Sequence, residues 1–325
     1  MGLHHDYTRR FEVIMKINNI VIVGSGLIGK GLALVYSGCK DLNITLYDVK
    51  DDNVLDGVYK NMCQLEAHGV FTKDEIENRM NRIAFTTDFD DPCFAEADLV
   101  AECVFEEMQL KQNLFVQLEG KCRKDAIFAT NTSVMSITEI SAKIEHKQRL
   151  VGTHFWNPAH LIPLVEIVKS DYTSDEVAQT TLELLERAGK VAVLCKKDVP
   201  GFIGNRMQHA LWREALWILE NEVADADTID KTVRYSFGMR LPQLGPMENI
   251  DMVGADLAYN VHAYLFNHLD NSTTASPILE ELKNQGKLGF KSGGDGLQQW
   301  TPEQIEKSRK DLNEHLIKMI YDKRS

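Results

Sequence analysis

The chain up to residue 196 alternates between short apolar runs and longer amphipathic stretches. The runs are rich in β-branched residues and have the length of buried strands. They predict strands at 18–23, 43–48, 83–87, 98–104, 127–131, 150–155, 164–168 and 190–196. Stretches between them, such as 107–122 and 174–188, have the spacing of amphipathic helices. This alternation predicts an α/β domain built on a doubly wound sheet.

Two helices are predicted between the second and third strands. Residues 52–69 carry apolar side chains at helical spacing, and Gly69 ends this helix. Thr72 and Glu75 have the spacing of a capping box, which opens a second helix extending to about Ile83. The pair predicts a helical hairpin inserted into the α/β domain. A plain solvated excursion and a substrate-facing element are equally compatible with the pattern.

Beyond Pro200 and Gly201 the pattern becomes helical throughout. Helices are predicted at 202–220, 225–237, 247–269, 276–285 and 302–320. We therefore divide the chain into a tail (1–15), an α/β domain (16–199) and an all-α domain (200–325). The apolar content of the helical domain favours a role in substrate binding and in formation of a homodimer.

Composition and charge argue against several classes of function. The chain has 325 residues and a net charge of −12, which disfavours nucleic-acid and anionic-membrane partners. No apolar run approaches the roughly 18 residues that a membrane span needs. The six cysteines include no C-x-x-C pair, so we expect reduced thiols, no metal site and a cytoplasmic protein. Met15, just before the first strand, is the expected natural start.

A glycine motif follows the first strand directly. Gly24, Gly26 and Gly29 have the spacing G-x-G-x-x-G, and a small-residue helix begins there. Such glycines allow a tight turn, the approach of a pyrophosphate and close packing of helix on sheet. Asp48 ends the second strand, where an acid binds the adenosine ribose hydroxyls and repels a 2′-phosphate. The pattern is typical of a Rossmann-type domain that binds NAD. Domains that bind FAD share this glycine pattern. A glycine-rich turn that binds no ligand is the structural alternative.

Four polar residues lie at strand ends or in boundary turns: Ser133, His154, Glu166 and Asn205. Oxidation of an alcohol needs a base for the hydroxyl proton, and histidine suits that role near neutral pH. A carboxylate can orient the imidazole, and hydroxyl or amide groups can hold the reacting oxygen. Each residue alone also has a structural interpretation. His154 could be a satisfied strand-end residue, Glu166 a buried ion-pair member and Asn205 a helix cap.

With these residues in place, the chain resembles the 3-hydroxyacyl-CoA dehydrogenase family from about Lys16 to its C-terminal region. The matching stretches are 24–29 (GSGLIG), 131–133 (NTS), 154–158 (HFWNP), 164–166 (LVE) and 200–206 (PGFIGNR). A further lysine-glycine motif matches at 291–296, with Leu297 in place of an aromatic residue. The resemblance implies NAD as cofactor and a Rossmann domain followed by a helical domain. It also implies a homodimer and a place in fatty acid metabolism.

The resemblance also implies roles for individual residues. His154 is expected to be the base, Glu166 its partner, and Ser133 and Asn205 the groups that hold the substrate oxygen. Further positions are expected to bind the cofactor: Gly24, Gly26, Leu27, Ile28 and Gly29 in the loop, Asp48 at the adenosine ribose, Glu106 and Lys111 at the nicotinamide ribose, and Asn131, Ser133 and Asn157.

Two departures from the family pattern concern the substrate. Pro163 stands where the typical fatty-acid enzyme has a lysine, and residues 238–246 (GMRLPQLGP) replace the usual proline-methionine-glycine-proline turn. Both features resemble a side branch that includes lambda-crystallin-like gulonate, carnitine and pyridine-carboxylate dehydrogenases, which act on small free acids. Arg240 could clamp a substrate carboxylate or be a surface residue. The expected activity is oxidation of a 3-hydroxyl on a short acyl chain. A free hydroxy acid, or a non-catalytic NAD-binding role, remains the alternative.

Overall fold

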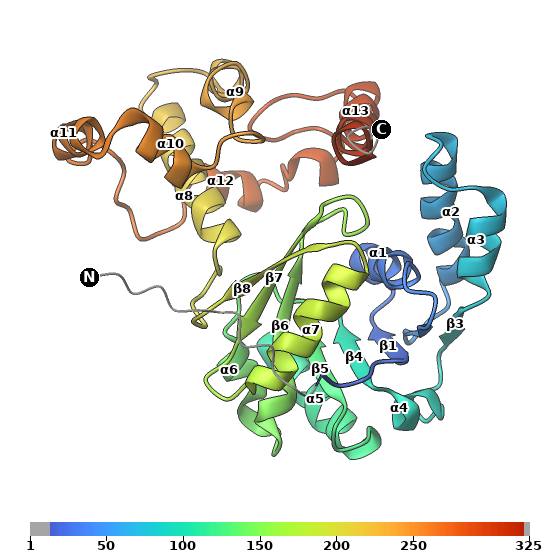
Figure 1. The fold of residues 1–325 in the computed structure, drawn as a ribbon. Coiled ribbons are helices and arrows are strands. Elements are labelled where there is room, and N and C mark those ends of the chain that lie inside the picture. The colour runs from blue at the N-terminus through green and yellow to red at the C-terminus, as the bar shows by residue number, and fades with distance from the viewer. Residues whose placement is uncertain (1–13, 322–325) are drawn as a thin grey trace. The chain divides into compact units, whose positions relative to one another are not determined.

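An eight-stranded sheet forms the centre of the first part of the chain in the computed structural model, which describes residues 14–321 (Figure 1). Its strands are β1 (Asn19–Val23), β2 (Asn43–Tyr47), β3 (Ile83–Thr86), β4 (Leu99–Glu102), β5 (Ile127–Thr130), β6 (Leu150–Phe155), β7 (Leu164–Lys169) and β8 (Val191–Cys195). The spatial order is β3-β2-β1-β4-β5-β6-β7-β8. Every neighbouring pair is parallel except β6 and β7, which are antiparallel. The predicted strands and the doubly wound Rossmann-type sheet are confirmed.

Alternate side chains of the central strands enter two different core clusters. On β1, Ile20 and Ile22 belong to one cluster and Val21 and Val23 to the other. A sheet covered on both faces buries every residue of its central strands. That burial explains why these strands read as continuous apolar runs rather than as alternating patterns.

Helices of this part of the chain flank the sheet. They are α1 (Leu27–Tyr36), α4 (Cys93–Glu96), α5 (Met108–Lys121), α6 (Ile137–Ile140) and α7 (Asp175–Arg187), with 3₁₀ turns at Ser141–Lys143 and Lys147–Arg149. α1, α5 and α7 lie where the sequence predicts helices. The two four-residue helices α4 and α6 were not predicted, because a single turn is too short to show a helical period.

The predicted hairpin consists of α2 (Val54–Ala67) and α3 (Lys73–Met80). Its capping box is present: the Glu75 backbone N–H donates to Thr72 Oγ1 at 3.2 Å, and the Thr72 N–H donates to Glu75 Oε2 at 2.8 Å. The apolar face of α2, including Val58 and Met62, is fully buried in the same core cluster as α1. The hairpin is therefore a packed element, and a plain solvated excursion is ruled out.

The chain divides into two compact units, which differ slightly from the predicted domains. One unit runs to Asn205 and resumes at Asn313, and the other comprises Arg206–Leu312. The helices beyond the sheet are α8 (Gly204–Glu220), α9 (Ala226–Arg234), α10 (Pro246–Val253), α11 (Ala255–Leu265), α12 (Pro277–Asn284) and α13 (Pro302–Tyr321), with 3₁₀ turns at Phe237–Met239 and Gly289–Lys291. The end of α13 belongs to the first unit because Ile317 packs in its core.

One predicted helix is wrong as a single element. The stretch 247–269 forms α10 and α11, separated by Gly254 with φ of +99°. That backbone conformation interrupts a helix and favours glycine. The residues on either side keep the helical spacing, so the sequence pattern alone shows no break.

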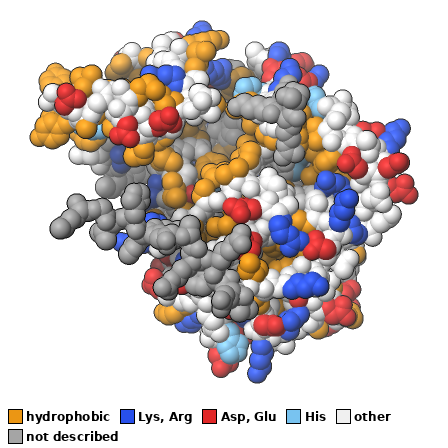
Figure 2. Space-filling view, viewed as in Figure 1, with side chains coloured by type: hydrophobic (Ala, Val, Ile, Leu, Met, Phe, Trp, Pro, Cys, Tyr) orange, Lys and Arg blue, Asp and Glu red, His pale blue; other side chains and the backbone are white. Residues whose placement is uncertain are grey.

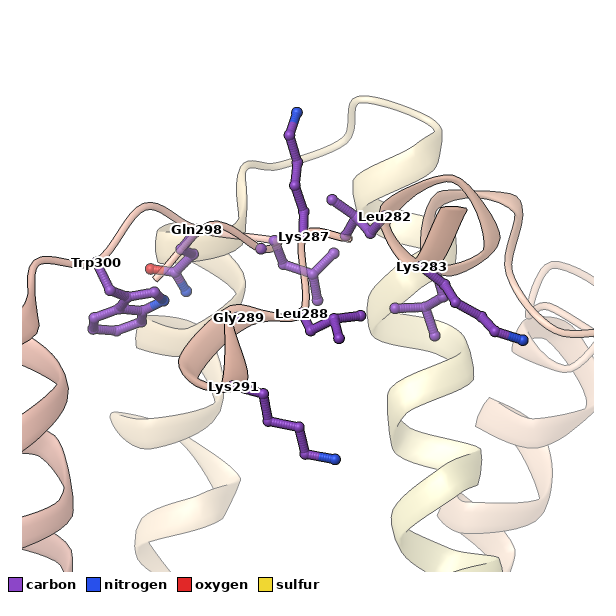
Figure 3. Close-up of a pocket in the computed structure, with 11 residues that line it drawn as sticks. Leu282, Lys283, Lys287, Leu288, Gly289, Lys291, Gln298 and Trp300 are labelled. Carbon is purple, nitrogen blue, oxygen red and sulfur yellow. The ribbon is translucent and has the colours of Figure 1, made fainter. Parts of the chain in front are cut away.

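The helices α8 to α12 contain no fully buried residue. Leu257, Val261 and Tyr264 form an exposed stripe along α11, and Figure 2 shows hydrophobic side chains gathered on the surface there. A pocket of about 440 Å³ lies between α12 and the stretch that carries the lysine-glycine motif. Leu282 and Leu288 line it, while the lysine ammonium groups point away (Figure 3). None of the predicted site residues lines this pocket. Within residues 14–321, no helix is long and apolar enough to cross a membrane.

Candidate active site

The glycine motif lies where the strand order of the sheet reverses. β1 pairs with β2 on one side and with β4 on the other. Ligands of doubly wound sheets bind in the crevice at this point, beyond the carboxyl ends of the strands. Gly24 follows β1, and the stretch from Cys103 to Glu106 follows β4, so both borders of the crevice carry predicted site residues.

The three glycines of the motif serve different purposes. Gly24 has φ of +100°, and a Cβ there would lie 2.6 Å from the Cys103 carbonyl oxygen. A Cβ on Gly29 would overlap the Gly24 carbonyl, so both positions are required by the fold. A Cβ on Gly26 would meet nothing within 4 Å. Gly26 therefore leaves open space, which fits a role in admitting a ligand.

The N-terminus of α1 faces this open space. Its N-cap, Gly26, supplies no side-chain hydrogen bond, and the first turn contains no acidic residue. Unpaired N–H groups at such an end attract phosphate oxygens. Leu27, the first residue of the helix, is 79% exposed. These features fit the pyrophosphate of a dinucleotide.

Asp48 connects the end of β2 to the glycine loop. Its Oδ2 accepts hydrogen bonds from the Ser25 backbone N–H at 2.8 Å and from Ser25 Oγ at 2.7 Å, and its Oδ1 accepts one from Val49 N–H at 2.8 Å. Partial burial raises the pKa of Asp48, but the Ser25 and Val49 hydrogen bonds outweigh it and leave the pKa below its usual value. The carboxylate is therefore ionised at neutral pH, as a ribose-binding acid must be.

His154 and Glu166 form a buried pair at the antiparallel junction of the sheet. They are directly opposite each other in the register of β6 and β7. His154 Nδ1 lies 2.7 Å from Glu166 Oε2, and the two residues are 4% and 0% exposed. Because an ionised carboxylate only accepts hydrogen bonds, we assign the proton to Nδ1. The Nε2 atom, which makes no hydrogen bond within residues 14–321, is then the basic nitrogen.

The second oxygen of Glu166 holds the start of α8. Oε1 accepts hydrogen bonds from the backbone N–H groups of Ile203 at 2.9 Å and Gly204 at 3.0 Å. Burial raises the pKa of Glu166. The hydrogen bonds from His154, Gly204 and Ile203 outweigh this effect and bring the pKa below its ordinary value. Glu166 is thus an anion that both orients the imidazole and satisfies a helix N-terminus.

Aromatic side chains enclose the imidazole. The rings of Trp156 and Phe202 lie 5.2 and 5.7 Å from the His154 ring. Gly204 makes room for this arrangement, since a Cβ there would lie 2.5 Å from the Trp156 ring. The indole Nε1 is buried without a hydrogen-bond partner within the described residues. The sequence pattern does not predict this enclosure, because its members come from two stretches that are far apart in the chain.

Ser133 and Asn205 are brought together beside this pair. Asn205 Nδ2 donates to the Ser133 carbonyl oxygen at 2.8 Å, and Asn205 directly follows the glycine that Glu166 binds. Asn131 joins the neighbouring strand ends, because its Oδ1 accepts a hydrogen bond from the Phe155 N–H at 2.9 Å. The predicted residues of β5, β6, β7 and α8 therefore belong to one connected site.

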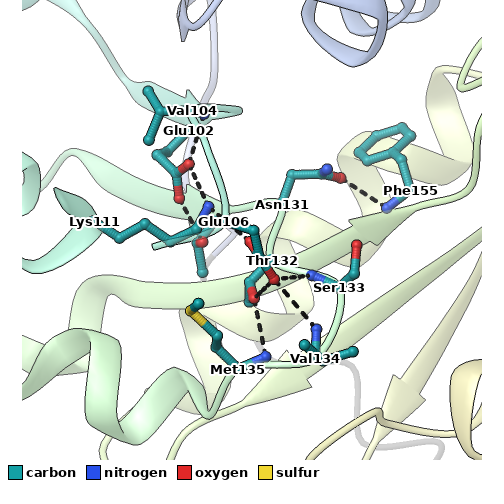
Figure 4. A network of polar contacts seen from close by, with 11 residues as sticks. Glu102, Val104, Glu106, Lys111, Asn131, Thr132, Ser133, Val134, Met135 and Phe155 are labelled. Carbon is teal, nitrogen blue, oxygen red and sulfur yellow. Dashed lines mark hydrogen bonds and ion pairs between the residues drawn. The ribbon is translucent and has the colours of Figure 1, made fainter. Parts of the chain in front are cut away.

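A second buried network positions the loop that carries Ser133 (Figure 4). Lys111, 1% exposed, lies between Glu102 Oε1 at 2.7 Å and Glu106 Oε2 at 3.2 Å. Glu106 Oε1 in turn accepts hydrogen bonds from Thr132 Oγ1 at 2.5 Å and from Ser133 N–H at 2.8 Å. Burial raises the pKa of Glu106, but Thr132 and Lys111 outweigh it and keep the pKa low.

Glu102 was not among the predicted site residues. It is fully buried at the end of β4 and also accepts hydrogen bonds from Thr130 Oγ1 at 2.6 Å and Val104 N–H at 2.8 Å. The signal that identifies Glu166, a carboxylate within an apolar strand, is also present at Glu102. The same reasoning applied to the predicted strand 98–104 would have found it.

Three other residues singled out from the sequence are not members of these hydrogen-bond networks. Asn157 is exposed after β6. Arg240 is exposed in the helical unit, and the other predicted site residues belong to the first unit. Pro163 lines a separate cavity, described below, which none of the predicted catalytic residues lines. Its position gives no support to a direct role in substrate choice.

The switch-point crevice and the glycine loop define a Rossmann-type domain with the features of a dinucleotide-binding site. Residues 19–199 match the family model for the NAD binding domain of 3-hydroxyacyl-CoA dehydrogenase, and residues 201–299 match the model for its C-terminal domain. The chain belongs to the 3-hydroxyacyl-CoA dehydrogenase family. It is thus a dehydrogenase that acts on a CH–OH group with NAD.

Relatives of the chain differ in the substrates that their names give. A 5-formyl-3-hydroxy-2-methylpyridine 4-carboxylate 5-dehydrogenase from Mesorhizobium japonicum is 33% identical over 305 residues, or 89% of this chain and 93% of the relative. A crystal structure of an enzyme of that activity, described as an NAD⁺-dependent dismutase, is 32% identical with a TM-score of 0.85, covering 93% of this chain and 97% of the other. A probable 3-hydroxybutyryl-CoA dehydrogenase from Deinococcus radiodurans is 34% identical over 276 residues, or 84% and 96% of the two chains.

Proposed function

We propose that this protein oxidises the hydroxyl group of a small carboxylic acid, with His154 as the general base. The observation that carries this proposal is the buried His154–Glu166 pair, whose basic Nε2 makes no hydrogen bond within the described residues. NAD, when bound, supplies the acceptor for the hydride that leaves the carbinol carbon. The Gly24–Gly29 loop, the N-terminus of α1 and Asp48 would hold it.

The residues of the chain have distinct roles in the proposed reaction. His154 Nε2 takes the hydroxyl proton, and Glu166 stabilises the imidazolium that results. The Ser133 hydroxyl and the Asn205 amide hold the substrate oxygen, and Glu106 places Ser133 through its backbone N–H. Trp156 and Phe202 exclude water around the base, which strengthens these electrostatic interactions. Lys111 supports the loop that carries Ser133 through its ion pair with Glu106.

A free acid is favoured as the substrate by the similarity to the pyridine-carboxylate enzyme, which extends over almost the whole of both chains. A short 3-hydroxyacyl-CoA is the second candidate, because a relative with 34% identity is named a probable 3-hydroxybutyryl-CoA dehydrogenase. The exposed guanidinium of Arg240 would bind a substrate carboxylate, and it lies in the loop that departs from the family pattern.

A substrate panel tests the proposal. NADH formation would be followed with hydroxylated pyridine carboxylates, gulonate, carnitine, free 3-hydroxybutyrate and short 3-hydroxyacyl-CoA thioesters. We expect turnover on at least one free acid and a higher KM with Arg240→Gln, while Arg234→Gln, an exposed arginine elsewhere in the helical unit, serves as the matched control. Turnover confined to the CoA esters would exclude the free-acid proposal. Tight NAD binding without turnover on any compound would support the non-catalytic alternative.

We further propose that the protein forms a homodimer through its helical unit. The exposed stripe Leu257, Val261 and Tyr264 supports this assembly, since soluble monomers rarely expose contiguous apolar surface of this kind. The absence of fully buried residues from α8 to α12 supports it as well, because these helices lack the core that a free-standing bundle needs.

A further inference from the structure

A second polar cavity lies in the first unit, apart from the residues of the proposed active site. Its volume is about 150 Å³. It is lined by the end of α1, by Phe71 and Arg79 of the hairpin, by His160 to Pro163 in the β6–β7 loop, by the α7–β8 turn and by the last turn of α13. Arg79, His160 and Lys190 bring three basic side chains to this one space. No carboxylate side chain is among its lining residues.

Arg79 lies here without a carboxylate partner. Its guanidinium stacks over the Phe71 ring at 4.4 Å, and its Nη1 donates to Ser37 Oγ at 3.3 Å. It forms no ion pair within residues 14–321. Because a guanidinium has five N–H donors, most of its hydrogen-bonding capacity remains available. Burial lowers the pKa of Arg79, and the charge of nearby Glu75 opposes this effect without reversing it.

Lys190 is held by backbone carbonyls alone. Its Nζ donates to the Ala159 oxygen at 2.6 Å and to the Ile162 oxygen at 2.8 Å, which leaves its third proton available. Burial lowers the pKa of Lys190 to about 8. The ammonium is therefore still charged at neutral pH, and no carboxylate in the described part of the chain neutralises it. An anion in the cavity would remove this electrostatic cost.

His160 adds a neutral donor. Its Nε2 is buried and has no hydrogen-bond partner within residues 14–321. Burial and the charge of Lys190 lower the pKa of His160 to about 4, so the ring is uncharged at neutral pH. In the tautomer with a proton on Nε2, this orphaned atom becomes a donor toward an anion. Buried polar atoms without a partner are rare and call for a specific explanation.

We propose that this cavity binds a free inorganic phosphate ion through Arg79, Lys190 and His160. The cavity volume of about 150 Å³ is enough for a tetrahedral oxyanion. Arg79 and Lys190 carry positive charge and present only donors, and the Nε2–H tautomer of His160 adds one further donor, which matches the charge and oxygen acceptors of phosphate. Leu34, Val35 and Leu161 form an apolar part of its wall.

The test is calorimetric titration of the full-length protein with sodium phosphate. Saturating NAD would be present, so that phosphate cannot occupy the glycine loop, and sodium chloride at equal ionic strength would serve as the salt control. We expect saturable binding of phosphate by the wild type and at least tenfold weaker binding by Arg79→Gln and by Lys190→Met. Lys124→Met, which removes an exposed lysine elsewhere, should bind as the wild type does.

Two results would overturn the proposal. One is equal heats with phosphate and chloride, which would indicate a general salt effect. The other is unchanged phosphate affinity in Arg79→Gln. That variant decides the question even if Lys190→Met fails to fold, because Arg79 does not share the carbonyl contacts through which Lys190 ties the β6–β7 loop.

Discussion

At the scale of single residues, the site depends on how each buried charge is satisfied. Glu166 has no exposed surface, yet both of its oxygens have partners: the imidazole on one side and two backbone N–H groups on the other. A buried carboxylate without such partners would become protonated. The ionised form is what makes Glu166 able to stabilise a charged imidazole beside it.

Replacement of His154 tests the proposed base directly. His154→Gln should lower kcat by roughly 10²-fold or more, which is the usual scale for loss of a general base. The affinity for NAD should stay near the wild-type value, because His154 is not part of the glycine loop. Steady-state kinetics and calorimetric NAD titration would measure the two quantities. Undiminished turnover would remove His154 from its proposed role, and His68→Gln, at an exposed position, provides the control.

His160 makes stability depend on pH. Its folded-state pKa of about 4 lies below the unfolded value of 6.5, so between these values the folded state binds fewer protons than the unfolded state. The stability contribution is therefore present above pH 6.5 and is lost as the pH falls toward 4. Each pKa unit corresponds to about 1.4 kcal/mol, so the loss reaches roughly 3 kcal/mol.

His160→Gln should remove this dependence. Urea unfolding between pH 4 and 7, in buffers free of phosphate, should show a shallower decline in the free energy of unfolding than the wild type shows. His68→Gln should follow the wild-type curve, because its side chain is exposed. If the free energy of unfolding declines equally with pH in the wild type and in His160→Gln, the folded-state pKa of His160 is not lowered.

At the scale of elements, the active site is a set of loops tied together by buried side chains. The end of β4, the start of α5 and the loop after β5 meet at Lys111, which is enclosed by Glu102 and Glu106. Glu106 contacts the loop with Ser133 directly, and Lys111 holds Glu106 in place (Figure 4).

Loss of Lys111 should leave two carboxylates uncompensated. Lys111→Met should lower the free energy of unfolding by about 3–5 kcal/mol, since removal of one partner from a buried pair leaves a buried charge. The double change Glu102→Met with Lys111→Met should recover part of that loss. Urea unfolding would measure both variants, with exposed Lys124→Met as the control. A double variant no more stable than the single one would argue against the charge explanation.

In the β1–α1 loop, Gly24 is needed for folding, whereas Gly26 is free to serve cofactor binding. Gly26→Ala adds a methyl group to open space, so the free energy of unfolding should change little, while NAD affinity should fall at least tenfold as the cofactor's approach is blocked. Gly120→Ala, in α5 and equally unhindered, is the matched control and should leave NAD affinity unchanged. Wild-type NAD affinity in Gly26→Ala would place the pyrophosphate elsewhere.

At the scale of the whole molecule, the helical unit and the sheet differ in how completely they bury their apolar side chains. The sheet buries both of its faces, whereas the helices α8 to α12 leave large apolar side chains exposed. Association is the usual way in which a soluble protein covers such a surface. The stripe on α11 is its most regular part, with Leu257, Val261 and Tyr264 at helical spacing.

Charges on this stripe should dissociate the proposed dimer. The double change Leu257→Lys with Val261→Lys should yield a monomer at micromolar concentration, because lysine ammonium groups would be buried at the contact. Asn260→Lys, on the same helix at an exposed polar position, should keep the dimer. Light scattering after size-exclusion chromatography distinguishes the two states. A monomeric wild type would contradict the proposed assembly.

Much of the fold follows from periodicity along the chain. All eight strands were predictable because each is an apolar run bounded by polar or glycine residues. The helices α4 and α6 were missed because they are single turns. The break at Gly254 was missed because an isolated glycine in a helical pattern is usually tolerated. The helical spacing of residues 302–320 does not show that the end of α13 packs in the core of the first unit.

The sequence by itself determined the sheet, the glycine loop and the set of side chains able to do acid–base chemistry. Only the tertiary structure decided which of them meet. His154 and Glu166 pair because β6 and β7 are antiparallel and in register, and Arg79, His160 and Lys190 share a cavity because five distant segments converge there. The physical reason is that the periodicity of apolar residues indicates which face of a helix or strand is buried. Strand order and register depend on contacts between residues far apart in the chain.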